Sequence, residues 1–147
     1  MSSYRIEPIE AADTYPLRLA VLRDNTPSTD VVFDGDSEPG VLHLGTRNTD
    51  GELVAVSTWM PRALDDRVGV QLRGMATAAH VQGQGLGGLL LEEGCRRCAD
   101  RGVTLVWANA RDTALDFYHR HGFVVEGDGF IAASSGLPHH VVLRTLV

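Results

Sequence analysis

One short segment rich in glycine is the strongest indication of a binding site in the sequence. Four of the six residues from 83 to 88 are glycine: Gly83, Gly85, Gly87 and Gly88. Before this segment, apolar and polar residues alternate over residues 68–76 as in a strand, and after it apolar residues recur at helical spacing to about residue 100. The first amides of a helix lack partners and carry partial positive charge, and glycines let a bulky group reach them. We therefore predict that this glycine turn binds a phosphate or pyrophosphate.

Two nucleotide-binding motifs fit the glycine turn poorly. A P-loop ends in Gly-Lys followed by Ser or Thr, whereas Gly87, Gly88 and Leu89 supply neither a lysine nor a hydroxyl. A dinucleotide fingerprint has the spacing G-x-G-x-x-G and an acidic residue at the end of the next strand. The turn is one residue short of that spacing, and the next predicted strand, residues 104–108, is followed by Asn109. A dinucleotide enzyme is therefore a weak alternative.

A second segment, about 30 residues further on, favours a third interpretation. Residues 82–87 match the Q/R-x-x-G-x-G/A acyl-CoA pyrophosphate motif, and residues 114–123 (ALDFYHRHGF) are similar to the motif A-x-x-F-Y-x-x-x-G-F. With both motifs in this order, the chain resembles the GCN5-related N-acetyltransferase (GNAT) superfamily, well over residues 68–147 and loosely over the first 67. Residues 136–139 (GLPH) resemble a stretch near the end of small uncharacterised bacterial acetyltransferases, the branch we expect for this chain.

The resemblance implies an α/β (α+β) fold of GNAT type. In that fold a mixed, mainly antiparallel central sheet splays open between two parallel strands, with helices on both faces. Acyl-CoA lies in the opening, where its peptide-like arm satisfies backbone groups that the separated strands leave unpaired.

The hydrophobic pattern of the chain is compatible with such a fold in a single domain spanning residues 1–147. It predicts strands at residues 4–7, 41–45, 53–60, 68–76, 104–108, 123–126 and 141–145. It predicts helices at residues 10–23, from the glycine turn to about 100, and at 113–121. In the first helix we expect Asp13 or Thr14 to form the cap and Leu17, Ala20 and Val21 to form the buried side.

The resemblance also assigns roles to individual residues. The residues implied to line the CoA arm are Met75, Ala76 and Thr77, and those implied to cradle the pyrophosphate are Gly83, Gln84, Gly85, Leu86, Gly87 and Gly88. Gln82 helps to hold the loop, and Asn109 contacts the cofactor. A backbone N–H near Ala76 stabilises the oxyanion, and Tyr118 protonates the departing CoA thiolate. A phenol titrates at about 10 and a thiol at about 8.5, close enough for proton sharing in a dry cleft.

The general base is left open by the sequence. An attacking amine must lose its proton, and several side chains are candidates for accepting it. The candidates are His43, His139, Glu52, Asp66 and Asp34, with an ordered water chain as the further alternative.

The resulting hypothesis is an N-acetyltransferase that moves an acetyl group from acetyl-CoA to a primary amine of a small molecule or a protein. A non-catalytic acyl-CoA-binding regulatory domain is the alternative. Residues 25–66, the least family-like part, choose the acceptor, and their pattern does not identify it. The acidic side chains at positions 30, 34, 36 and 38 could hold a cation, although solvated loop carboxylates are commoner.

Composition narrows the partners and the location. The net charge of −6 disfavours a nucleic-acid partner and mildly suits a cationic amine. No segment has the length and hydrophobicity of a signal core or membrane span, so we expect no membrane partner and a cytoplasmic location. Cys95 and Cys98 have no second ligand pair, which predicts buried thiols and no metal site. Related proteins are often homodimers, but the sequence does not fix the oligomeric state.

Overall fold

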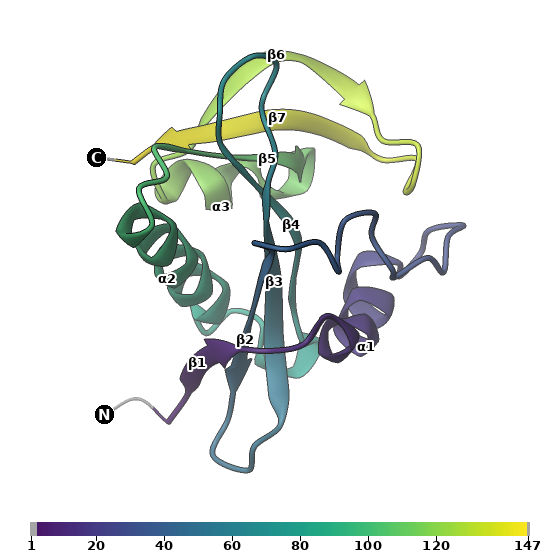
Figure 1. Cartoon of the computed structure of the whole chain (residues 1–147). Coiled ribbons are helices and arrows are strands. Elements are labelled where there is room, and N and C mark those ends of the chain that lie inside the picture. Colours follow the sequence, from purple (N-terminus) through teal and green to yellow (C-terminus); the bar gives the residue numbers. More distant parts are fainter. Residues whose placement is uncertain (1–2, 147) are drawn as a thin grey trace.

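The computed structural model describes residues 3–146, which form one seven-stranded mixed sheet (Figure 1). The strands are β1 (Arg5–Pro8), β2 (Leu42–Arg47), β3 (Leu53–Pro61), β4 (Val70–Thr77), β5 (Leu105–Arg111), β6 (Val124–Ile131) and β7 (Pro138–Thr145). Their order across the sheet is β1-β2-β3-β4-β5-β7-β6. Only β4 and β5 are parallel neighbours, and every other pair is antiparallel. The predicted fold class and the parallel pair are therefore confirmed.

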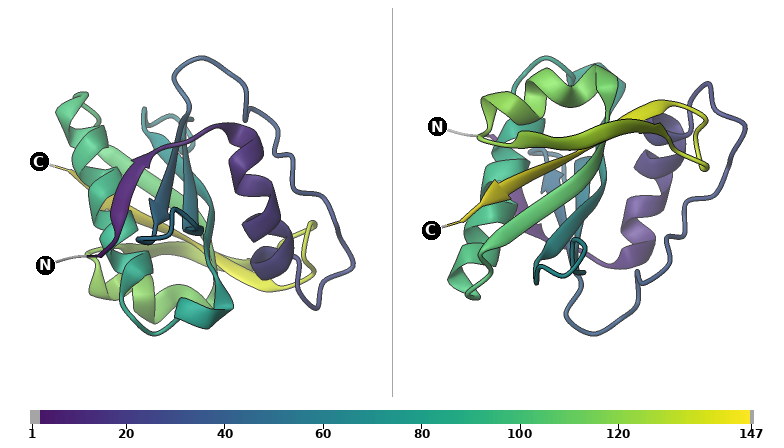
Figure 2. Two further views of the ribbon diagram at one scale, coloured as in Figure 1. Left: turned by 90° about the horizontal axis from the view of Figure 1, so that it is seen from below. Right: turned by 90° about the horizontal axis from the view of Figure 1, so that it is seen from above.

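Helices cover both faces of the sheet (Figure 2). The longest is α2 (Leu86–Asp100), which lies on the same side as α3 (Leu115–Arg120), whereas α1 (Tyr15–Leu17) and its flanking turns lie on the other side. Short 3-10 turns are η1 (Ala11–Thr14), η3 (Ala79–Val81) and η4 (Asp112–Ala114), and η2 (Arg18–Leu22) is a π-helical segment. No helix among these described residues is both long enough and apolar enough to cross a membrane.

Helix α2 packs tightly on the sheet because a glycine faces a tryptophan. A Cβ at Gly94 would lie 1.8 Å from the Trp59 ring, so only glycine lets the helix approach β3 this closely. The apolar face of the helix buries Leu90, Leu91 and Cys95 in the main core. Cys95 and Cys98 are free and buried, as predicted, and burial raises the pKa of Cys95 to about 12. These thiols are therefore unreactive packing groups at neutral pH.

The first predicted helix is helical, but its buried side differs from the prediction. Three short segments of different pitch replace one regular helix over residues 11–22. The fully buried side chains are Thr14 and Arg18, whereas Ala20 is exposed and Leu17 is only half-buried. Asp13 does act at the start, where its carboxylate accepts a bond from the Glu10 amide at 3.0 Å. A buried arginine has replaced the expected apolar stripe because its charge is paired inside the protein.

Candidate active site

The sheet opens between its two parallel strands. Strands β4 and β5 are paired only at Val70↔Val106 and Gln71↔Trp107, after which no pairing between them continues. Beyond that point β5 is paired with β7 on its other side up to Arg111. The backbone of β4 therefore has one edge without a strand neighbour from Leu72 onward, where an extended ligand could bind as an additional strand.

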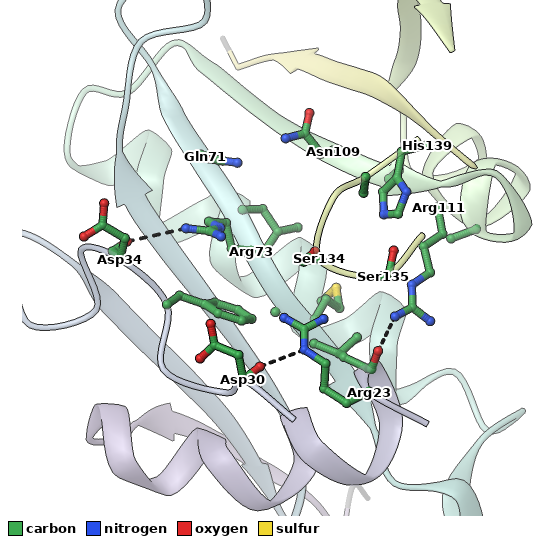
Figure 3. A pocket seen from close by; sticks show the side chains of 18 of the residues that line it. Arg23, Asp30, Asp34, Gln71, Arg73, Asn109, Arg111, Ser134, Ser135 and His139 are labelled. Atoms are coloured by element: carbon green, nitrogen blue, oxygen red, sulfur yellow. Dashed lines mark hydrogen bonds between the residues drawn. The ribbon is translucent and has the colours of Figure 1, made fainter. Parts of the chain in front are cut away.

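A cavity of about 440 Å³ lies at this opening (Figure 3). Its walls come from the end of η2, the loop after it, β4, β5, α3 and the turn between β6 and β7. The volume is within the range typical of small-molecule sites. Of the residues predicted from the sequence to take part, Met75, Asn109, Tyr118, Asp34 and His139 line this cavity.

The glycine turn presents bare amides at the start of α2. Gly83 and Gly85 have φ of 84° and 80°, a conformation that glycine adopts without strain, and Gly85 is the N-cap residue with no side-chain cap. The first backbone bond of the helix runs from the Leu89 amide to the Gly85 carbonyl. Within the described chain, none of the amides of residues 83–88 donates a hydrogen bond to a protein group. Six amides at a helix N-terminus are thus available to an anion.

Neighbouring side chains shape the space in front of these amides. The Gln82 side chain donates to the Thr77 carbonyl at 2.9 Å and ties the turn to the end of β4. A Cβ at Gly87 would lie 3.5 Å from Thr77 Oγ1 and 3.6 Å from the Phe117 ring. The missing side chain of Gly87 therefore leaves room between β4 and α3 beside the free amides. Gln84 is exposed, and Leu86 is buried in a small apolar cluster.

Strand β4 carries a β-bulge where it borders the opening. Its register with β3 shifts so that Gly74 and Met75 together lie opposite the single residue Ser57. Gly74 has φ of 63°, and both bulge residues line the cavity. Such a bulge interrupts the regular ladder and redirects the local backbone.

The amide of Ala76, expected to face the opening, is directed the other way. The Ala78 amide donates to the Val54 carbonyl at 2.8 Å, and bonded and non-bonded pairs alternate along an antiparallel ladder. Ala76, opposite Val56, therefore belongs to a bonded pair and its N–H points to β3. Thr77, between the two, points its N–H away from β3. Ala76 itself is buried and does not line the cavity.

Tyr118 borders the cavity from α3. Its ring packs edge-to-face on Phe117 and Phe123, at centroid distances of 5.2 and 5.3 Å. No described residue hydrogen-bonds to its hydroxyl. Burial raises the pKa of Tyr118, and the nearby Cys95 raises it further. The phenol is therefore neutral at physiological pH and is a hydrogen-bond donor, and its raised pKa lies further from that of a thiol than we expected from the sequence.

His139, at the start of β7, is the histidine that the structure places in the cavity wall. Its Nδ1–H donates to the Leu137 carbonyl at 2.8 Å, which fixes the tautomer. The ring stacks on Phe130, with centroids 5.8 Å apart. Nε2 has no hydrogen-bond partner among the described residues and is left as an acceptor. Figure 3 shows the ring pointing toward the interior of the cavity.

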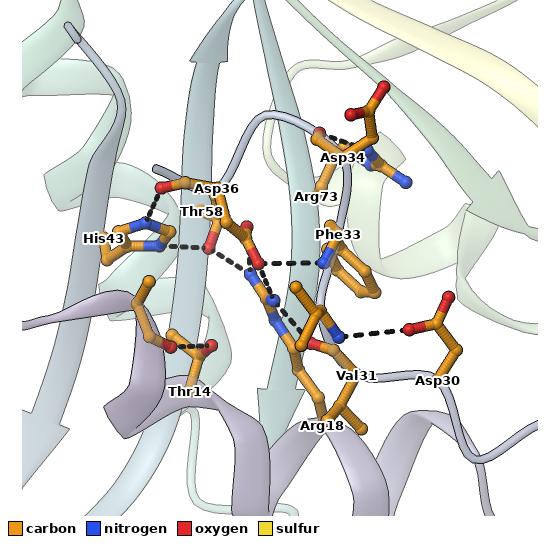
Figure 4. A network of polar contacts seen from close by, with 12 residues as sticks. Thr14, Arg18, Asp30, Val31, Phe33, Asp34, Asp36, His43, Thr58 and Arg73 are labelled. Atoms are coloured by element: carbon orange, nitrogen blue, oxygen red, sulfur yellow. Dashed lines mark hydrogen bonds and ion pairs between the residues drawn. The ribbon is translucent and has the colours of Figure 1, made fainter. Parts of the chain in front are cut away.

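His43, another candidate for the general base, lies in a buried hydrogen-bond network outside the cavity (Figure 4). Arg18 forms a buried ion pair with Asp36, 2.7 Å from Nη1 to Oδ2, and also donates to Thr58 Oγ1 at 2.8 Å. The Thr58 hydroxyl in turn donates to His43 Nδ1, and His43 Nε2–H donates to the Asp36 carbonyl at 2.9 Å. Both ring nitrogens are therefore occupied away from the cavity.

The same network explains one acidic residue of the preceding loop. Burial alone would raise the pKa of Asp36, but the bonds from Arg18 and the Phe33 amide hold it below its usual value. Of the remaining base candidates, Glu52 lies in the β2–β3 turn, where it contacts His80 at 3.2 Å, and Asp66 is exposed in the turn before β4. Neither lines the cavity.

Residues 41–125 match the family profile of the acetyltransferase (GNAT) domain. The chain belongs to the GNAT family of acetyltransferases. Membership implies an acyl-CoA co-substrate and acyl transfer to an acceptor, and the observed site fits such a molecule. The bare amides suit its diphosphate, and the unpaired edge of β4 suits its amide-containing arm.

Individual relatives agree with this assignment. An uncharacterised N-acetyltransferase of Bacillus subtilis, YitI, is 29% identical over 141 residues, which cover 94% of this chain and 93% of that protein. Among solved structures, Escherichia coli ElaA has a TM-score of 0.80 at 20% identity, covering 96% of this chain and 99% of that one. An acyl-CoA N-acyltransferase from Pseudomonas aeruginosa has a TM-score of 0.79 at 23% identity, covering 97% and 99%. These structural likenesses show the GNAT fold.

Several polar residues that line the GNAT cavity were not predicted from the sequence. They are Arg23, Gln71, Arg73, Arg111, Ser134 and Ser135. Arg73 precedes the bulge of β4, and Arg111 ends β5 beyond the point where the predicted strand stopped. The sequence could have indicated Arg111 as a cavity residue, because it lies two residues after Asn109 and so faces the same side of an extended strand.

Proposed function

We propose that this protein transfers an acetyl group from acetyl-CoA to a primary amine of a small molecule or a protein, by direct attack in a ternary complex. The observation that carries the proposal is the set of bare amides at residues 83–88 beside an unpaired strand edge. The diphosphate would bind to the amides of Gly83, Gln84, Gly85, Leu86, Gly87 and Gly88. The pantetheine arm would extend along Thr77 and Met75 toward Asn109.

The acyl-CoA supplies an activated thioester, and the protein stabilises charge around it. We assign the oxyanion contact to the amide of Met75, in place of Ala76. Met75 lies in the bulge and lines the cavity, whereas the Ala76 amide is bonded to β3. A donor fixed at this position before the reaction stabilises the charge that develops on the carbonyl oxygen.

Two side chains transfer the protons of the reaction, one at the attacking amine and one at the departing thiolate. His139 Nε2 accepts the proton of the attacking amine, because its Nδ1–H is already bonded to Leu137. The neutral hydroxyl of Tyr118 donates to the sulfur of the departing thiolate. Proton transfer through solvent from His139 to Tyr118 then restores both groups and balances the reaction.

Titration calorimetry with acetyl-CoA tests the first half of this proposal. We expect the folded wild type to bind acetyl-CoA and the variant Gly85→Asp/Gly87→Asp to lose binding, since the new carboxylates repel the diphosphate. Absence of binding by the wild type, or full binding by this variant, would reject the assignment.

Thiol release with a panel of primary amines tests the second half. An acetyltransferase releases CoA when a suitable amine is added. A regulatory domain binds acetyl-CoA and releases no thiol with any acceptor, so binding without turnover over the whole panel would replace catalysis with sensing.

A further inference from the structure

Three arginines line the cavity: Arg23 from the segment after η2, Arg73 from β4 and Arg111 from β5 (Figure 3). Within residues 3–146, no carboxylate lies within ion-pair distance of any of these guanidinium groups. They are separate from the glycine turn, because residues 82–88 do not line this cavity. These cations therefore lie away from the amides proposed to hold the diphosphate, in the cavity that His139 also lines.

Backbone carbonyls hold these side chains in place. Arg23 Nε donates to the Asp30 carbonyl at 2.7 Å, Arg73 Nη1 to the Asp34 carbonyl at 3.4 Å, and Arg111 Nη2 to the Leu22 carbonyl. A guanidinium group has five N–H donors, so most donors on each arginine are not used by these bonds. The arrangement fixes positive charge without neutralising it.

The environment of two of these arginines favours an additional anion. Burial lowers the pKa of Arg73, and the positive charge of Arg62 lowers it further. Burial likewise lowers the pKa of Arg111, and the charge of Arg23 adds to this effect. Both guanidinium groups remain charged at neutral pH. The charges of Asp36 and Asp34 offset this effect at Arg73 only in part. Half-buried like charges raise the energy of the empty cavity, and a bound anion would relieve that repulsion.

The acidic side chains in the same wall compensate only partly. Asp30 and Asp34 line the cavity, but the Asp30 carboxylate accepts a bond from the Val32 amide at 3.2 Å. Figure 3 shows the Asp34 carboxylate on the side of its loop away from Arg73. The protein as a whole has a net charge of −6, so the positive cavity is a local feature opposed to the overall charge.

We infer that the acceptor amine carries an anionic group, a carboxylate or a phosphate, which Arg73 and Arg111 bind while the amine faces His139. This inference rests on the proposed acetyltransferase function. Arginine is suited to the task because its planar donors bind carboxylate and phosphate in a bidentate manner. The cavity of about 440 Å³ favours a small acceptor or the exposed end of a chain.

Matched acceptor pairs test the inference. Phenylalanine and phenethylamine differ by one carboxylate, and phosphoethanolamine and ethanolamine differ by one phosphate. We expect kcat/KM to be at least about 10-fold higher for the anionic member of one pair. The pair that shows the preference identifies which anion the site accepts. Equal or better use of both members that lack the anionic group would overturn the inference.

Variants that remove one positive charge show which arginine causes the preference for an anionic acceptor. Arg73→Gln and Arg111→Gln should each reduce the ratio of kcat/KM between the acceptor with the anionic group and the acceptor without it about 10-fold, because a charged hydrogen bond contributes about that much. Arg101→Gln removes the same charge from an exposed position at the end of α2 and should leave the ratio unchanged. Using a ratio within each variant separates acceptor recognition from any change in folding. An unchanged ratio in both cavity variants would reject the assignment.

Titration calorimetry in the presence of CoA separates the anion site from the proposed catalysis. It measures the binding of phenylalanine and of phosphoethanolamine. Binding that weakens in Arg73→Gln, without turnover of any amine, would support the anion site and reject the proposed catalysis. Absence of binding together with turnover of amines that lack an anionic group would reject the anion site and leave the proposed catalysis intact.

Discussion

Replacing Gly87 with alanine should raise stability and retain acyl-CoA affinity, whereas replacing it with aspartate should reduce the affinity. Gly87 is the second residue of α2 and has a negative φ, so alanine fits the backbone and is the better helix former. Its Cβ would make ordinary van der Waals contacts with Thr77 and Phe117. We expect the free energy of unfolding to rise by about 0.5 kcal/mol, half the value inside a helix because residue 87 lies in the first turn. The melting temperature should then rise by about 1–2 °C.

Affinity should survive the alanine because the acyl-CoA motif accepts glycine or alanine at this position, and one methyl group beside Thr77 and Phe117 still lets a diphosphate reach the amides. Gly87→Asp instead places a carboxylate there, which would hold a diphosphate away from at least one N–H of the first turn. Hydrogen bonds to charged groups contribute about 1.5–3 kcal/mol, so loss of one should weaken acetyl-CoA binding about 10- to 150-fold.

The measurement combines thermal unfolding with titration calorimetry on the same samples. Leu89→Ala is the matched control, since Leu89 lies in the same helix with its side chain 56% exposed. This control should keep affinity within about two-fold of wild type. Wild-type affinity in a stably folded Gly87→Asp variant would show that the first turn of α2 does not hold the diphosphate.

Three further substitutions address separate parts of the structure. Tyr118→Phe should lower kcat about 100-fold with acetyl-CoA affinity unchanged by calorimetry, and unchanged kcat would remove the hydroxyl from the mechanism. His139→Ala should lower kcat/KM about 100-fold and be partly rescued by added imidazole, and full activity would return the base to solvent. Asp36→Asn should cost about 3–5 kcal/mol in urea unfolding by leaving Arg18 unpaired. Because the folded pKa of Asp36 is lowered, its contribution should be complete above its unfolded pKa of about 4 and be lost as pH falls through the lower folded value. A wild-type stability that is independent of pH across that range would contradict this role.

Local patterns in the sequence were sufficient to predict the framework of the site. The hydrophobic pattern located all seven strands, and the glycine turn preceded α2 as expected. Between the two predicted strands that became β2 and β3, Asn48 Oδ1 accepts bonds from the amides of Asp50 and Glu52 and closes a tight turn. Each of these features depends on residues that are neighbours in the chain, which is why a single sequence reveals them.

Features that join distant segments were not predictable in the same way. Arg18 and Asp36 are separated by 18 positions, and nothing in either neighbourhood indicates that they form a buried pair. The bulge at Gly74 and Met75 depends on the register with β3, so the sequence alone could not tell which amide of β4 faces the opening. The ends of β5 and β7, which carry Arg111 and His139, extend further than their apolar patterns because they pair with each other.

The buried network gives the acceptor side of the cavity a fixed wall despite its irregular backbone. The loop after η2 contributes Asp30, Phe33 and Asp34 to that wall, and it has no strand partner to hold it. Arg18 supplies the missing connection by binding the Val31 carbonyl at 2.8 Å and the Asp36 carboxylate. Its guanidinium also lies 3.8 Å from the centre of the Phe33 ring.

The same arginine reaches the bulge of β4. A Cβ at Gly74 would lie 3.0 Å from Arg18 Nε and 2.8 Å from the Phe33 ring, so a side chain there would push the loop and the strand apart. Gly74 is thus required both by its positive φ and by this contact. One buried cation therefore sets the position of the loop that carries Asp34, the carbonyl partner of Arg73, relative to the strand that carries Met75. We therefore expect Arg18 to hold the proposed acceptor wall and the proposed oxyanion donor in position together.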